Sequence, residues 1–153
     1  MRWLECLIPP PLVALIVGLG MWGVAYLMAP LSAPRWLMED AALALGTAGV
    51  ALSAAGVLAF RAAGANINPH HIDRGDALVT SGVYRFTRNP MYLGIAIVLC
   101  GYAAFLSRPV DLLGPVIFGA YLTRFQILSE ERAMRTKFGA AYTVYARATR
   151  RWI

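Results

Sequence analysis

The stretch from residue 78 to 94 concentrates polar and aromatic side chains in a chain that is otherwise mostly apolar. Hydroxyl and guanidinium groups come together in it, from Tyr84, Arg85, Arg88 and Tyr92. Asn89 followed by Pro90 is typical of a helix start, because asparagine can cap free backbone amides and proline loses no hydrogen bond at the first helical position. A capped helix start attracts anions, so we expect a carboxylate or phosphate site here; the alternative is that these residues only begin a helix.

Glu130 and Glu131 form the second polar group. The C-terminal end of a helix favours cations, so an acidic pair near the end of an apolar segment indicates that the helix continues or that a ligand uses the carboxylates. On a continuous helix Glu131 shares a stripe with Arg124 and Arg135, its expected salt-bridge partners. Glu130 shares a stripe with Gln126 and with no arginine, which leaves it available for a ligand's amine or ribose hydroxyls. A solvated charge cluster is the alternative.

The elements that must position these groups are predicted to be membrane-spanning helices. A composition of 59% hydrophobic and 14% charged residues excludes an ordinary water-soluble globule. Uncharged runs of 19, 20 and 17 residues occupy 11–29, 41–60 and 91–107, and about 20 residues cross the hydrocarbon layer of a bilayer. A fourth crossing after Asp111 must carry Arg124 and Gln126 near one membrane face or toward a protein cavity.

We therefore expect an all-α integral membrane protein with four transmembrane helices in a single domain over 1–153, with two packing spans in 1–62 and the functional core in 63–153. In the tail, aromatic and polar residues recur at i, i+4, i+7 and i+11, as Phe138, Tyr142, Tyr145 and Thr149. This pattern predicts a C-terminal helix lying at the membrane surface, with Trp152 as an interface anchor. Small residues such as Gly49 and Ser53 allow close helix packing and permit a homodimer.

The basic residues predict the orientation. With four spans, twelve arginines and lysines fall on the side of the termini and the 61–90 loop, whereas only Arg35 and Arg108 fall on the other. The positive-inside rule then places the termini and that loop in the cytoplasm. Basic residues beside an anionic leaflet account for most of the net charge of +6 without nucleic acid as a partner.

Several kinds of site are excluded or disfavoured. His70 and His71 are adjacent, so they do not converge on one metal, and Cys6 and Cys100 form no C-x-x-C pair. No phosphate-binding loop and no Ser-His-Asp set occurs. A small transporter relies on a carboxylate buried mid-span, and the first three predicted spans contain none. A non-catalytic transporter or scaffold is therefore a secondary hypothesis.

The blocks "AGANINPHHIDRGDALVTSGVYRFTRNPMYLG" (63–94) and "SEERAMRTKFGAAYTVY" (129–145) resemble the isoprenylcysteine carboxyl methyltransferase family and its relatives, the phospholipid N-methyltransferases. The resemblance covers roughly the C-terminal 90 residues, and the first two spans add nothing to it. It implies a membrane enzyme that binds S-adenosyl-L-methionine on the cytoplasmic side and takes a lipophilic methyl acceptor from the bilayer.

Carried over by position, the resemblance implies cofactor contacts at Ala77, Leu78, Val79, Tyr84, Asn89, Pro90, Met91, Tyr92 and Glu130. The family's Arg-His-Pro is Arg88-Asn89-Pro90 here, so a histidine contact becomes an amide. The family's substrate-side arginine falls on Gln126, with Arg124 nearby, and we expect these two residues to orient the acceptor.

The resemblance implies methyl transfer to the carboxylate of a prenylcysteine-like molecule. The alternative acceptor is the ethanolamine headgroup of a phospholipid, and a sterol reductase, which shares the architecture distantly, would need a nicotinamide cofactor instead. Methyl transfer from a sulfonium needs the acceptor held in line in a dry pocket more than it needs acid–base groups. We expect the loop and tail to close over the cofactor, and the third and fourth spans to admit the acceptor.

Overall fold

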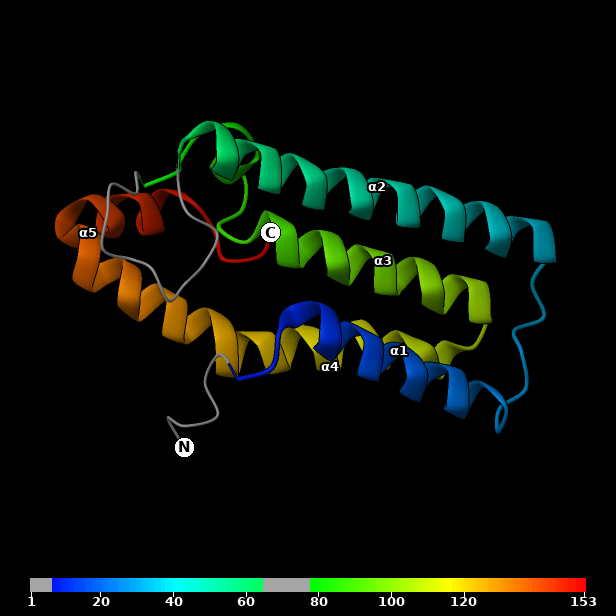
Figure 1. Ribbon diagram of the computed structural model, residues 1–153. Coiled ribbons are helices and arrows are strands. Elements are labelled where there is room, and N and C mark those ends of the chain that lie inside the picture. Colours follow the sequence, from blue (N-terminus) through cyan, green and yellow to red (C-terminus); the bar gives the residue numbers. More distant parts are fainter. Residues whose placement is uncertain (1–6, 65–77) are drawn as a thin grey trace.

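The computed structural model describes residues 7–64 and 78–153, and these residues fold entirely into helices and connecting segments. The bundle consists of helices α1 (Pro10–Ala25), α2 (Arg35–Ala62), α3 (Pro90–Leu106) and α4 (Leu113–Leu122), which lie side by side (Figure 1). Successive helices run in opposite directions. The all-α prediction is confirmed.

The fourth helix is much longer than its apolar segment. A 3-10 turn, η3 (Pro109–Leu112), leads into α4, and a π-helical turn, η4 (Thr123–Ile127), joins α4 to α5 (Leu128–Ala148). The result is one helix over Pro109–Ala148, 40 residues long. The tail that we expected as a separate surface helix, α5, is therefore a direct continuation of α4. The direction of α4 consequently sets the position of Glu130 and Glu131 in α5.

Two helices, α2 and Pro109–Ala148, are long and apolar enough to cross a membrane, whereas α1 and α3 are apolar but shorter. Only 11% of the apolar window in α2 and 28% of that in Pro109–Ala148 is buried. A helix from the core of a soluble protein would be mostly buried, and here large side chains such as Leu15, Leu43 and Ile117 are more than half exposed. These findings describe a helical membrane protein with two candidate spans.

The expected helix boundaries agree with the structure at α3 and differ at α2. Pro90 begins α3 as predicted, and Ser107 ends it in the left-handed conformation with φ 57°. The second helix starts at Arg35, six residues before the uncharged run of 41–60, and Arg35 and Glu39 form an i,i+4 ion pair of 2.8 Å in its first turns.

Helices α2 and α3 meet backbone to backbone through small residues. A Cβ on Gly49 would lie 2.5 Å from the carbonyl oxygen of Gly94, and a Cβ on Gly94 would strike Ser53. The Ser53 hydroxyl donates a hydrogen bond of 3.1 Å to the Met91 carbonyl. The small-residue face that permitted a homodimer in the sequence is therefore occupied by α3 of the same chain.

The apolar core lies between α1, α3 and α4, with Met21, Leu99, Phe118 and Leu122 buried in it. A second, smaller cluster packs Val79 and Tyr84 against the end of α2. Tyr84 belongs to the 3-10 turn η2 (Gly82–Arg85). This cluster ties the polar segment after residue 78 to the bundle.

Helix α5 bends at Gly139, whose φ of 53° and ψ of −119° are not helical. Only glycine adopts such angles readily. Figure 1 shows the last part of α5 turning back toward the start of α3. The aromatic face expected at the membrane surface consequently contacts the protein: Tyr142 is 4% exposed, and the Tyr145 hydroxyl donates to the Tyr84 carbonyl at 2.8 Å.

Candidate active site

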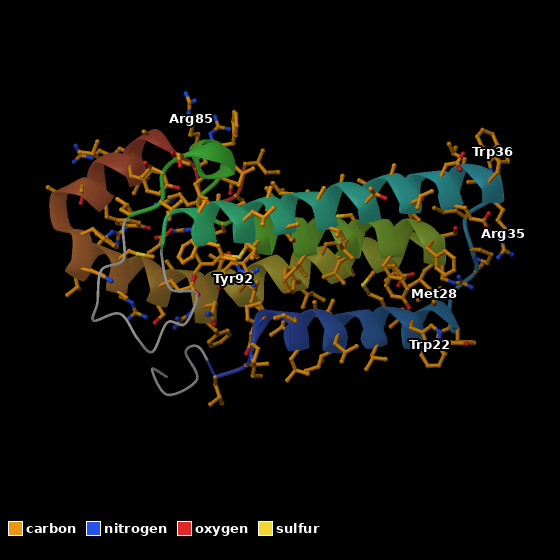
Figure 2. The ribbon with its side chains drawn as sticks, turned by 45° about the horizontal axis from the view of Figure 1, so that its top comes forward. Trp22, Met28, Arg35, Trp36, Arg85 and Tyr92 are labelled. Carbon is orange, nitrogen blue, oxygen red and sulfur yellow. The ribbon has the colours of Figure 1, made fainter. Side chains whose placement is uncertain are left out.

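Polar residues gather at one end of the bundle, where α2 ends, α3 begins and α5 turns back. Figure 2 shows Arg85 toward this end and Arg35, Trp36 and Met28 at the opposite end. The two sequence blocks that attracted attention, 78–94 and 126–131, meet here.

Tyr92, Glu130 and Gln126 form the central contact between the two blocks. The Tyr92 hydroxyl donates to Glu130 Oε1 at 2.6 Å, and Gln126 Nε2 donates to the same oxygen at 2.6 Å. Among the residues that the structure describes, both of these hydrogen bonds go to Oε1 of Glu130 and none goes to Oε2. The carboxylate is thus oriented through one of its two oxygens.

The π turn η4 decides which side chains face this site. A π turn inserts an extra residue into the helix, so residues two turns apart across it, such as Arg124 and Glu131, no longer lie on one stripe. Gln126 is 7% exposed and reaches Glu130, whereas Arg124 points to the surface, where its guanidinium lies 5.5 Å from the centre of the Phe125 ring. The expected pairing of Arg124 with Glu131 is wrong for this reason.

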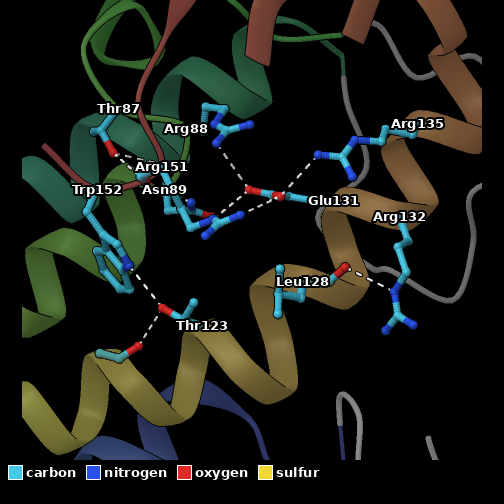
Figure 3. Close-up of polar contacts among 11 residues, drawn as sticks. Thr87, Arg88, Asn89, Thr123, Leu128, Glu131, Arg132, Arg135, Arg151 and Trp152 are labelled. Carbon is cyan, nitrogen blue, oxygen red and sulfur yellow. Dashed lines mark hydrogen bonds and ion pairs between the residues drawn. The ribbon is translucent and has the colours of Figure 1, made fainter. Parts of the chain in front are cut away.

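Glu131 is the centre of a cationic cluster. Its carboxylate accepts two hydrogen bonds from Arg151, at 2.8 and 2.9 Å, and forms ion pairs with Arg88 at 3.3 Å and Arg135 at 3.6 Å (Figure 3). The pairing with Arg135 confirms the prediction from helix spacing. The hydrogen bonds to Glu131 raise the pKa of Arg151, which therefore stays charged. Three guanidinium groups surround a single 4% exposed residue.

Arg88 and Tyr84 carry buried polar atoms that the described residues leave unsatisfied. Arg88 Nε and Nη1 and the Tyr84 hydroxyl have no hydrogen-bond partner there. Burial, together with the nearby Tyr145 and the charge of Glu130, raises the pKa of Tyr84, so its hydroxyl stays neutral. Buried donors without partners are uncommon in folded proteins, so these atoms are candidate contacts for a ligand.

Asn89 does not cap α3, contrary to our expectation. No side-chain hydrogen bond caps this helix. Instead Asn89 Nδ2 donates to the carbonyl of Arg151 at 2.9 Å, and the Arg88 amide donates to the carbonyl of Arg150 at 3.0 Å. Thr87 adds a hydroxyl bond to the Arg151 carbonyl. The side chain of Asn89, which stands where the family has a histidine, therefore binds the C-terminal segment through the Arg151 carbonyl.

Trp152, which we expected to anchor the tail at the membrane interface, contacts the protein itself. Its indole Nε1 donates to Thr123 Oγ1 at 3.0 Å, and the Thr123 hydroxyl donates to the Gly119 carbonyl (Figure 3). The ring packs against the apolar core. The segment 149–152 thus joins the start of α3 to the π turn.

The remaining residues expected at a cofactor lie in different surroundings. Val79 is buried against the end of α2, Pro90 is fully buried beside Gly56, and the Met91 carbonyl is bonded to Ser53. Leu78 is half-buried. Val79, Pro90 and Met91 thus contact α2. Ala77 lies outside the described residues, as do His70 and His71.

Sequence reasoning missed the part played by Arg151, Thr87 and Thr123. Arg150 and Arg151 read as a basic tail beside the membrane, and neither threonine carries a motif. The excess of arginines over acidic residues in the tail could have indicated them, because a buried carboxylate such as Glu131 needs more cations than its own helix supplies. The partner could not be chosen without the bend at Gly139.

The fold and site thus define a class: a helical membrane protein with a buried acidic and cationic site at one end of its bundle. Comparison with known proteins narrows that class. The model of the phospholipid methyltransferase family matches residues 40–141, two thirds of the 153 residues, and the chain belongs to this family. The match begins at residue 40, so α2 is part of the family domain, although the resemblance seen in the sequence began at residue 63.

Two relatives are similar over parts of the chain. An uncharacterized protein of Haemophilus influenzae is 35% identical over 63 residues, which is 41% of this chain and 100% of that protein. The protein-S-isoprenylcysteine O-methyltransferase A of Arabidopsis thaliana is 37% identical over 84 residues, 53% of this chain and 39% of that protein. The aligned region therefore spans less than half of the Arabidopsis protein. Methyltransferases of this family use S-adenosyl-L-methionine, which confirms the expected cofactor.

Proposed function

We propose that the end of the bundle around Glu130 binds S-adenosyl-L-methionine and that a methyl group is transferred there to a lipophilic acceptor from the membrane. The observation that carries the proposal is the contact of Tyr92 and Gln126 with Glu130 Oε1. It brings together two sequence blocks separated by more than thirty residues, and both belong to the matched family domain.

The side chains fit the charged groups of this cofactor. The Glu130 carboxylate suits its ammonium group or ribose hydroxyls, and the buried N–H groups of Arg88 suit its carboxylate. The Tyr84 hydroxyl offers a further neutral donor. When bound, the cofactor supplies a methyl group already activated on a sulfonium. The chain contributes binding, orientation and exclusion of water.

For the acceptor we propose the carboxylate of a prenylcysteine-like molecule, as in the name of the Arabidopsis relative. A carboxylate oxygen bonds to the methyl carbon while the carbon–sulfur bond breaks and its electron pair goes to sulfur, so no proton must be removed. Arg124, exposed at the end of the apolar segment, would orient the anionic acceptor, with Gln126 behind it. This chemistry needs no general base, and it suits a site whose described residues include the arginines around Glu131.

The second candidate acceptor is the ethanolamine headgroup of a phospholipid, which the description of the matched family favours. Gln126 stands where the resemblance expects an arginine, and it is already bonded to Glu130. An amine acceptor must also lose a proton, for which a nearby base or water is needed.

A labelled methyl donor separates the candidates. The purified protein in detergent is incubated with methyl-labelled S-adenosyl-L-methionine and either a farnesylated cysteine derivative or phosphatidylethanolamine. We expect label in the cysteine derivative that alkali releases as methanol, since a methyl ester hydrolyses and an N-methyl group does not. Alkali-stable label in phosphatidylethanolamine would select the second acceptor. No transfer and no binding of the methyl donor would support the scaffold hypothesis.

We also propose that all four apolar helices cross the membrane, with both termini and the active site in the cytoplasm. The excess of basic residues at the Glu130 end supports this orientation. In a variant without native cysteines, Ser32→Cys and Thr143→Cys place thiols at exposed positions of opposite ends. An impermeant maleimide added to intact cells should label Ser32→Cys only. Labelling of Thr143→Cys alone would show the opposite orientation, with the termini and the active site outside the cytoplasm.

A further inference from the structure

A second polar feature lies at the opposite end of the bundle. Asp111, in η3, is 2% exposed, and neither carboxylate oxygen has a hydrogen-bond partner among residues 7–64 and 78–153. Nineteen residues of continuous helix separate it from Glu130 (130 − 111 = 19), or about 28 Å at the usual helical rise. Asp111 therefore plays no part in the site described above.

The neighbouring cation does not satisfy this carboxylate. The Arg108 guanidinium donates to the carbonyls of Met28 at 2.9 Å and Leu106 at 2.5 Å. No ion pair to Asp111 is formed within the described ranges. A buried carboxylate needs hydrogen-bond donors or a cation, and this part of the chain supplies neither.

Asp111 lines a cavity of about 270 Å³ between α1 and the start of α4. The rest of its wall is apolar or glycine and includes Gly20, Met21 and Gly114. The Met21 side chain lies over Gly114, where a Cβ would strike its sulfur. Methionine is flexible, so Met21 can move aside for a ligand.

The cavity borders the exposed apolar surface of the bundle. Leu113 and Ile117, both in its wall, are 56% and 57% exposed. In a membrane protein these side chains face lipid, so an acyl chain can lie along α1 and α4 while its polar headgroup reaches Asp111.

We propose that this cavity binds the headgroup of a membrane lipid that carries a primary ammonium group. The two unsatisfied oxygens of Asp111 are acceptors, so a cation with N–H groups satisfies both their charge and their hydrogen bonding, which a quaternary ammonium cannot do. The positive charge of Arg108, in the same turn, attracts the lipid phosphate even while its Nε and Nη1 donate to carbonyls. This proposal does not rest on methyl transfer, since the site lies at the other end of the molecule.

The test compares two lipids and two pairs of variants. The protein in neutral detergent, without methyl donor, is titrated with phosphatidylethanolamine or with phosphatidylcholine of the same acyl chains, and its unfolding temperature is measured. Asp111→Asn removes the charge, and Asp40→Asn, an exposed aspartate of the same end, is its control. Gly20→Leu fills the cavity from α1, and Gly23→Leu is its control, because neither glycine has a neighbour within 4 Å of an added Cβ and Gly23 does not line the cavity.

We expect phosphatidylethanolamine to raise the unfolding temperature by about 4 °C and phosphatidylcholine by less than about 1 °C at matched concentrations. Asp111→Asn and Gly20→Leu should abolish the difference between the lipids, and both controls should keep it. Asp111→Asn should be at least as stable as the wild type without lipid. Equal stabilisation by the two lipids, or a difference that survives in either site variant, would overturn the proposal.

Discussion

Glu130 and Glu131 are adjacent and chemically identical, yet the structure gives them different surroundings. Glu131 accepts hydrogen bonds from Arg151 and forms ion pairs with Arg88 and Arg135. Arg88 and Arg151 come from distant parts of the sequence. Among residues 7–64 and 78–153, Glu130 contacts only neutral donors, Tyr92 and Gln126. Glu131 is therefore positioned to hold the polar end of the molecule together, and Glu130 is positioned to bind a cationic group.

Replacing Glu131 tests the first of these roles. Glu131→Gln leaves buried guanidinium groups without their counter-charge, so we expect the free energy of unfolding to fall by about 3 kcal/mol. Arg135→Gln removes the partner whose side chain is 56% exposed, and its effect should stay within about 0.5 kcal/mol. Denaturant unfolding in detergent measures both, and equal effects would contradict the central place of Glu131.

Helix spacing and the family resemblance together predicted part of this site. The resemblance placed Tyr92 and Glu130 at one cofactor, and helix spacing paired Arg135 with Glu131. It could not place Arg124, because no residue pattern revealed the π turn that moves its side chain to the surface. It could not assign Asn89 either, since a capping asparagine and one that binds a distant carbonyl look alike in sequence.

At the scale of elements, the C-terminal segment links the start of α3 to the long helix Pro109–Ala148 by hydrogen bonds. Residues 149–152 bond to Thr87, Arg88 and Asn89 on one side and to Thr123 on the other. It thereby fixes the start of α3 relative to the helix that carries Glu130 and Glu131. The contacts to Thr87, Arg88 and Asn89 join residues more than sixty positions apart, and the contact to Thr123 joins residues 29 positions apart, so helical periodicity gave no sign of them.

Deletion of residues 150–153 should remove the hydrogen bonds that link the start of α3 to Thr123. We expect the helices to persist in circular dichroism, while the affinity for S-adenosyl-L-methionine falls at least about tenfold because Arg88 loses its fixed position. Deletion of Ile153 alone, which is 82% exposed, is the control. Unchanged affinity in the longer deletion would show that the segment does not position the site.

The α2–α3 contact is the other element-scale feature with a direct test. An added methyl at Gly49 would meet the backbone of Gly94 and Val98, so Gly49→Ala should destabilise the protein by about 1–3 kcal/mol. Gly46, one helical turn earlier, has nothing within 4 Å of an added Cβ. Gly46→Ala should therefore be neutral or stabilising by up to about 1 kcal/mol. Thermal unfolding of both variants compares them, and similar losses would argue against close packing here.

At the scale of the whole molecule, the uncharged segments of the sequence predicted the apolar helices and Pro90 predicted the start of α3. The tail was predicted to be helical and amphipathic, which is correct, but its apolar face was assigned to the membrane instead of to the protein. The reason is Gly139, whose positive φ turns Tyr142 and Tyr145 back onto the bundle. A glycine within a periodic segment is not enough to predict a bend from the sequence. Local patterns thus predicted the helices, whereas long-range contacts decided where the polar ends meet.

The central claim is that this meeting point binds the methyl donor through Glu130. Isothermal titration of S-adenosyl-L-methionine into the wild type and Glu130→Gln tests it most directly, with Glu39→Gln at the opposite end as the control. Loss of a charge-assisted hydrogen bond costs about 1.5–3 kcal/mol. The account therefore predicts an affinity about 10- to 100-fold weaker for Glu130→Gln, with its unfolding temperature little changed and Glu39→Gln like the wild type. Equal affinity in Glu130→Gln and the wild type would contradict the claim.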